Sequence, residues 1–186
     1  MKGIGATKGE RRGESAHGGD GARDVYQFLT FSVAGASYGV NIMAVREIIG
    51  WTQTTRLPNS PAYMKGVINL RGAIIPIFDL KCRFRLGSTD PNEKNVVVIM
   101  SVADKLIGVL ADTVSDILHC SEDDVRPAPQ LEGAKAREED EYIDGLISLG
   151  ENEMTMLLNV ERIFSEEKVR AIAEQAEKIR DDVRAA

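Results

Sequence analysis

The sequence of 186 residues contains few of the side chains that build metal centres and catalytic sites. Its two histidines and two cysteines, Cys82 and Cys120, form neither a zinc-ligand spacing nor a disulfide framework. We interpret both cysteines as reduced, partly buried apolar side chains. Asp112, Asp116 and His119 have the spacing of one helix face, but no second ligand cluster accompanies them. We therefore expect no metal ion, no cofactor and no catalytic residue.

Aromatic residues, positive charge and long apolar runs are also scarce. Aromatic side chains make up 5% of the chain, and the formal net charge is −6. An acidic chain repels phosphate backbones and, with few aromatic rings, offers little surface on which bases can stack, which disfavours an RNA-binding barrel. No apolar stretch approaches the roughly 20 residues of a membrane-spanning helix. We expect neither a nucleic-acid partner nor direct membrane insertion.

The two ends of the chain differ from the part between them. Residues 1–24 hold seven of the 17 glycines and almost no large apolar side chain, which predicts a disordered tail. Residues 165–186 carry apolar side chains at helical spacing among charges, and Ser165 is a suitable N-cap. This pattern predicts an amphipathic C-terminal α-helix that packs on its own domain.

The region between the ends is expected to be mainly β. Apolar and β-branched runs, most of them bounded by turn-forming residues, predict strands at Val25–Val33, Ser37–Ile42, Gly66–Leu70, Ile74–Leu80, Val96–Val102, Lys105–Leu110 and Met154–Val160. Helical spacing occurs in short pieces at Met43–Ile49, Leu80–Phe84 and Ala111–Leu118.

A repeat divides this region into two similar halves. Gly39 and Gly108 begin similar segments 69 positions apart, and Gly66 and Gly145 begin a second similar pair 79 positions apart. The ten additional residues fit the charged stretch Glu132–Glu141, which we expect to be a surface loop. Four glycines in matching order indicate an internal duplication.

The duplication predicts two small barrels, at about residues 25–86 and 94–164, within one domain at 25–164. Strands this short suit a closed barrel, and a barrel of about 60 residues buries little surface alone. We therefore expect the two barrels to share an apolar seam, where a helix of a partner could bind. A crossover of the chain between the barrels is left open.

The two halves also differ in charge. Residues 25–90 have a net charge of +4, with seven basic and three acidic side chains. Residues 91–164 have a net charge of −10, with six basic and sixteen acidic side chains. This polarity suits directional contact with two different partners, but an acidic loop that only keeps the protein soluble explains part of it equally well.

Asn69-Leu70-Arg71-Gly72 joins two predicted strands. Asn69 and Gly72 suit the geometry of a tight turn, whereas a turn does not require Arg71. A long cation at this position indicates an ion pair, for which Glu47 is the candidate within the chain, or a contact with a carboxylate or carbonyl of a partner. Both interpretations can hold together.

Several segments together resemble the bacterial chemotaxis coupling proteins of the CheW family; they are Tyr26–Phe31, Tyr38–Ile42, Val45–Ile48, Gly66–Gly72, Pro76–Leu80 and Arg126–Pro129. The resemblance covers about residues 24–164 and implies two five-stranded, SH3-like β-barrels on a hydrophobic seam. It further implies a non-catalytic adaptor, located in the cytoplasm at membrane chemoreceptor arrays. Its implied partners are the cytoplasmic tips of methyl-accepting chemoreceptors and the regulatory domain of the histidine kinase CheA.

The same resemblance implies a set of receptor-binding residues: Val45, Glu47, Gly66, Asn69, Arg71 and Ile117. Kinase contacts in this family use the barrel ends, for which the sequence indicates regions and no individual residues. The long glycine-rich start departs from the compact family pattern. A scaffold of the same fold in another sensory pathway, such as motility or gene control, is the alternative function.

Overall fold

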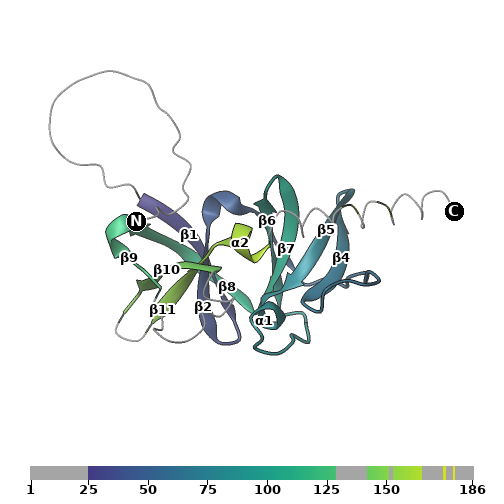
Figure 1. Ribbon diagram of the computed structural model, residues 1–186, viewed down its shortest axis with the longest axis horizontal. Coiled ribbons are helices and arrows are strands. Elements are labelled where there is room, and N and C mark those ends of the chain that lie inside the picture. Colours follow the sequence, from purple (N-terminus) through teal and green to yellow (C-terminus); the bar gives the residue numbers. More distant parts are fainter. Residues whose placement is uncertain (1–24, 129–141, 151–152, 165–173, 175–177, 179–186) are drawn as a thin grey trace, which may run out of the picture.

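The computed structural model describes residues 25–128, 142–150 and 153–164, together with Glu174 and Lys178. The described chain forms eleven strands in two sheets, with short helices between them (Figure 1), so the mainly β prediction is confirmed. The predicted tail at 1–24 and the charged loop at 132–141 lie outside the described residues. The predicted helix at 165–186 also lies outside them, except for Glu174 and Lys178.

The six-stranded sheet has the order β8-β1-β2-β11-β10-β9 and consists of β1 (Val25–Val33), β2 (Ala36–Asn41), β8 (Thr113–Ser121), β9 (Val125–Arg126), β10 (Ile143–Ser148) and β11 (Met154–Leu158). The five-stranded sheet has the order β3-β6-β7-β5-β4 and consists of β3 (Val45–Gly50), β4 (Met64–Leu70), β5 (Ala73–Asp79), β6 (Val96–Val102) and β7 (Lys105–Ala111). The seven predicted strands are observed as β1, β2, β4, β5, β6, β7 and β11, within about two residues at each end, whereas β3, β8, β9 and β10 were not predicted as strands. The short helices are η1 (Ile42–Ala44), α1 (Leu80–Arg83), η2 (Glu122–Asp124) and α2 (Val160–Ile163).

Two of the three predicted helical pieces are wrong. Met43–Ile49 falls mainly in β3, and Ala111–Leu118 falls mainly in β8. Both are strands at the edge of their sheet, and a register shift interrupts the pairing of each with its neighbour. Such a bulge breaks the alternation of buried and exposed side chains by which a strand is recognised. The third piece is confirmed as α1, where the Asp79 carboxylate accepts a hydrogen bond from the amide of Cys82 at 3.3 Å.

The two sheets do not follow the two sequence halves. Strands β1 and β2 of the first half pair with β8 and β11 of the second half. Conversely, β6 and β7 of the second half pair with β3 and β5 of the first half. The segments 25–86 and 94–164 are therefore repeat units of sequence, and each sheet is built from both of them.

Gly66 and Gly145 allow a short segment to pass closely over each sheet edge. Thr55 forms a β-bridge with Val67 on β4, and β9 pairs in the equivalent way with β10. A Cβ atom on Gly66, whose φ is +140°, would lie 2.4 Å from the Thr55 carbonyl oxygen. A Cβ atom on Gly145 would lie 2.6 Å from Cγ1 of Val125. These two glycines of the repeat thus permit the same closure in both sheets.

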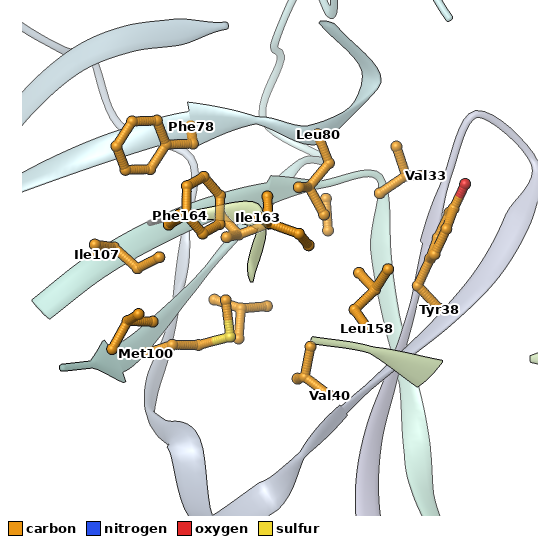
Figure 2. Close-up of a cluster of buried hydrophobic side chains, with 14 of the residues drawn as sticks. Val33, Tyr38, Val40, Phe78, Leu80, Met100, Ile107, Leu158, Ile163 and Phe164 are labelled. Atoms are coloured by element: carbon orange, nitrogen blue, oxygen red, sulfur yellow. The ribbon is translucent and has the colours of Figure 1, made fainter. Parts of the chain in front are cut away.

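The largest cluster of buried side chains joins the two sheets (Figure 2). Its members include Phe31, Val40 and Leu158 from the six-stranded sheet and Phe78, Val98, Met100 and Ile107 from the five-stranded sheet. Ile163 and Phe164 of the α2 region pack into the same cluster, and Figure 1 shows α2 between the sheets. The expected shared apolar seam is therefore observed. Cys120 is buried and Cys82 is half-buried, and both are free thiols.

Arg83 connects equivalent positions of the two repeat units across this seam. Tyr63 and Tyr142 occupy the same place in the repeat, since their carbonyl oxygens accept hydrogen bonds from the amides of Asp79 and Asn159, both at 2.8 Å. The Arg83 guanidinium lies 5.1 Å from the ring centre of Tyr63 and 4.6 Å from that of Tyr142. It also donates a hydrogen bond to the Tyr142 hydroxyl. Contacts of a cation with two rings add specificity to a seam that is otherwise apolar.

Candidate functional site

Arg71 and Glu47 form a two-fold hydrogen-bonded ion pair between the β4–β5 turn and β3. Arg71 Nη1 lies 3.0 Å from Glu47 Oε2, and Nη2 lies 2.7 Å from Oε1. The predicted partner of Arg71 within the chain is therefore confirmed. The side chain of Arg71 is 76% exposed and that of Glu47 is 31% exposed, so the pair lies at the surface. It presents an oriented guanidinium to solvent.

The other predicted residues near this pair shape the backbone that carries it. Asn69 accepts a hydrogen bond from the amide of Gly72 at 2.8 Å, which confirms its expected role in the turn. Arg71 itself has a φ of +52°, which the tight turn imposes. Val45 is half-buried and packs against the seam cluster, and Gly66 is buried beneath the Thr55 segment. Val45 and Gly66 thus serve the shape of the surface more than they contribute exposed area.

Ile117 lies apart from the other predicted residues, on β8 of the six-stranded sheet. Its side chain is 44% exposed. The equivalent residue of the first repeat unit is Ile48 on β3, beside Glu47, and it is 43% exposed. Sequence reasoning missed Ile48, although the repeat alignment with Ile117 contained the necessary signal. The structure therefore brings Glu47, Arg71 and Ile48 together on one sheet and places Ile117 on the other.

Asp112, which precedes β8, and Asp116 and His119 on β8 have partners within the chain, and that of His119 is Gln27, 2.8 Å from its Nε2. Asp112 accepts a hydrogen bond from the amide of Ala34 at 2.8 Å, and Asp116 accepts one from the amide of Ile117 at 2.7 Å. The expected helix face for Asp112, Asp116 and His119 does not form, because this segment is a strand. Within the described ranges, no group of three or more His, Cys, Asp or Glu side chains is arranged to hold a metal ion.

Comparison with known proteins identifies the family. A family model described as the CheW-like domain matches residues 27–168. This chain belongs to the CheW-like family. A probable chemotaxis protein CheW of Rhizobium etli is 39% identical over 140 residues, which cover 75% of this chain and 88% of that protein. The chemotaxis protein CheW of Klebsiella aerogenes is 38% identical over 143 residues, which cover 77% and 84% respectively.

A solved structure supports the CheW-like fold independently. The scaffolding protein TtCheW from Thermoanaerobacter tengcongensis superposes with a TM-score of 0.67 at 24% identity. The match covers 82% of this CheW-like chain and 96% of that chain. The described part of the chain contains no helix that is long and apolar enough to cross a membrane.

Proposed function

We propose that this CheW-like protein is a non-catalytic adaptor that couples the cytoplasmic tips of chemoreceptors to the histidine kinase CheA in chemotaxis. The proposed location is the cytoplasmic face of membrane receptor arrays. The proposed receptor-binding residues are Val45, Glu47, Gly66, Asn69, Arg71 and Ile117, with Ile48 added from the structure. Membership of the family supports this function.

The exposed Arg71–Glu47 pair is the observation that carries the receptor contact. An ion pair at this exposure contributes at most about 1 kcal/mol to folding, so stability alone gives little reason for it. Glu47 fixes the direction of the guanidinium, which reduces the conformational entropy that a partner must remove on binding. An exposed and oriented cation suits a helix of a partner that carries carboxylate or carbonyl groups. Ile48, 43% exposed, is the next residue of the edge strand β3 and offers an apolar contact on the other face of that strand.

The adaptor function is tested by co-sedimentation with vesicles that carry a receptor cytoplasmic fragment. The full chain is expected to bind the vesicles and to bring soluble CheA down with it. Arg71→Glu is expected to weaken vesicle binding about ten-fold, because it replaces the oriented cation by a repelling charge. Lys105→Glu, on β7, makes the same charge change at another exposed position and should bind normally.

Two outcomes would contradict the proposal at different levels. If the wild-type chain binds neither receptor vesicles nor CheA at about 50 μM, the adaptor function is wrong. If Arg71→Glu binds as well as wild type, the receptor contact lies elsewhere. The exchange Arg71→Glu with Glu47→Arg restores an ion pair within the chain but reverses its direction. Full recovery of binding in that variant would show that Arg71 only positions the turn.

A further inference from the structure

The sequence repeat produces a similar polar site in each of the two repeat units. In the first repeat unit, a linker of the chain itself occupies this site. Lys65 Nζ lies 3.1 Å from the buried Asp79 Oδ2. The linker that follows α1 binds both charges: Thr89 donates its amide to Asp79 Oδ2 at 2.8 Å, and Lys65 donates to Ser88 Oγ at 2.9 Å. Two residues of the linker, Ser88 and Thr89, thus occupy the site in the first repeat unit.

The second version has the same backbone and different charges. Asp144 stands at the position of Lys65, and Asn159 stands at the position of Asp79. Asn159 Nδ2 donates to both Asp144 oxygens, at 3.2 and 3.1 Å, and Arg162 Nη1 lies 3.2 Å from Asp144 Oδ1. A groove of about 470 Å³ opens beside Asp144 and Asn159. This volume lies in the range of ligand-binding sites.

The walls of the groove combine apolar and polar side chains, and its charged residues are mostly acidic. Tyr26, Phe28 and Leu157 line it from the six-stranded sheet, and Met43, which is 78% exposed, borders it. A flexible thioether at this position can adapt to an aliphatic side chain. The charged lining residues are Asp104, Asp144, Glu161 and Arg46. Arg46, together with Arg162, which pairs with Asp144, compensates two of the three negative charges, so the groove keeps a net charge of −1.

Two of these acids replace lysines of the first version. Lys65 corresponds to Asp144, and Lys81 corresponds to Glu161. The electrostatic preference of the site is therefore reversed between the repeat units. A chain segment that suits the second version must carry positive charge where the linker carries none.

We propose that this groove binds an extended segment of a partner protein in which Lys or Arg alternates with aliphatic residues. The cations pair with Asp104 and Glu161 at the rim, and the aliphatic side chains pack on Met43 and Tyr26. The groove shares no residue with the proposed receptor-binding set, so this inference stands independently of the receptor contact.

The test measures fluorescence anisotropy of a labelled, capped peptide, Ser-Leu-Arg-Leu-Lys-Ser-Gly, with the full chain at low salt. Saturable binding is expected, and the double variant Asp104→Asn with Glu161→Gln should weaken it about five-fold through the loss of two ion pairs. Asn suits position 104 because the backbone there has a φ of +61°. The matched control, Asp90→Asn with Glu93→Gln, removes the same charge from the exposed linker and should change binding less than about two-fold.

The same assay separates the groove from simple charge attraction. The peptide with Glu in place of Arg and Lys should bind at least about ten-fold more weakly to the wild type. The variant Asp104→Asn with Glu161→Lys should reverse that preference. Equal weakening in the groove variant and the linker control would show attraction by net charge and would overturn the proposal. An absence of saturable peptide binding to the wild type would overturn it as well.

Discussion

The hydrogen-bond donors around Asp79 stabilise the ionised form of its carboxyl group, although the group is buried. Burial by itself raises the pKa of this carboxyl. Hydrogen bonds from the Thr89 amide, Lys65, the Thr89 hydroxyl and the Cys82 amide outweigh burial and lower the pKa below its ordinary value. The unfolded chain therefore takes up this proton at a higher pH than the folded chain does. The contribution of Asp79 to stability is present above about pH 4 and is lost as pH falls below it.

We predict that Asp79→Asn lowers the free energy of unfolding by about 3 kcal/mol at pH 7, because it leaves the nearly buried Lys65 without its counter-ion. The loss of stability on acidification from about pH 5 to 3 should be smaller in the variant than in the wild type. Urea denaturation at several pH values measures both effects. Asp90→Asn, on the same linker, should retain the wild-type profile, and an unchanged profile in Asp79→Asn would contradict this account.

Single residues were predictable where the sequence places both partners in recognisable local structure. The turn residues Asn69 and Gly72 and the pairing of Arg71 with Glu47 follow from residue type and are confirmed. The network around Asp79 was not predicted. Its partner Lys65 is fourteen residues away, and Thr89 lies in an irregular linker, so only the folded chain brings them together.

At the scale of elements, central strands were easier to predict than edge strands. β6 is buried over most of its length, and its run of valines and isoleucine is a clear sequence signal for a buried strand. β3 and β8 lie at sheet edges and expose side chains such as Ile48 and Ile117. Exposure of apolar residues together with a bulge gave both segments a helix-like spacing. The same exposure is what makes them candidate binding surfaces.

The closures at Gly66 and Gly145 provide a prediction at the scale of elements. Gly66→Ala and Gly145→Ala are each expected to lower the free energy of unfolding by about 2 kcal/mol, because the added methyl group meets the closing segment. Gly50→Ala is the matched control, since no atom lies within 4 Å of its Cβ position. Thermal and urea denaturation measure these differences. Equal effects at Gly50 and Gly66 would show that the close approach to Thr55 is unimportant.

At the scale of the whole molecule, the two repeat units depend on each other. All sheet pairings of β1 and β2 beyond their own hairpin are made with β8 and β11, and the second repeat unit is arranged in the same way. A chain cut between Asp90 and Pro91 keeps the Thr89–Asp79 hydrogen bonds within the first fragment.

We predict that fragments 1–90 and 91–186 remain unfolded when separate and form a folded one-to-one complex when co-expressed, because each sheet needs strands of both. Affinity purification through a tag on one fragment, followed by circular dichroism and size-exclusion chromatography, measures this association. A cooperative unfolding transition of either fragment alone as a monomer would contradict the prediction.

The charge polarity of the sequence persists in the sheets despite the exchange of strands. β1, β2 and β6 contain no charged residue, and β7 contains one, Lys105. The exchanged strands therefore carry little charge into the other sheet. Among the described strands, those of the five-stranded sheet carry a net charge of +1, from Arg46, Lys65 and Lys105 against Glu47 and Asp79. Those of the six-stranded sheet carry −1, from Arg126 against Asp116 and Asp144.

If this polarity directs partner binding, the affinity for receptor vesicles or for CheA should fall as salt rises beyond about 0.15 M, because the screening length shortens. Co-sedimentation across a series of salt concentrations measures the dependence. An affinity that does not change with salt would assign the polarity to solubility alone.

Local residue patterns were enough to predict the mainly β class, the duplication, most of the central strands, the Asn69–Gly72 turn and the resemblance to the CheW family. Three features became visible only in the folded chain: the two sheets exchange strands, Ile117 lies on a different sheet from Arg71, and the linker fills one copy of the polar site while a groove opens beside the other. These features arise from pairing between distant segments. Each strand of a duplicated sequence has two nearly equivalent partners, and the packing of the whole chain selects between them.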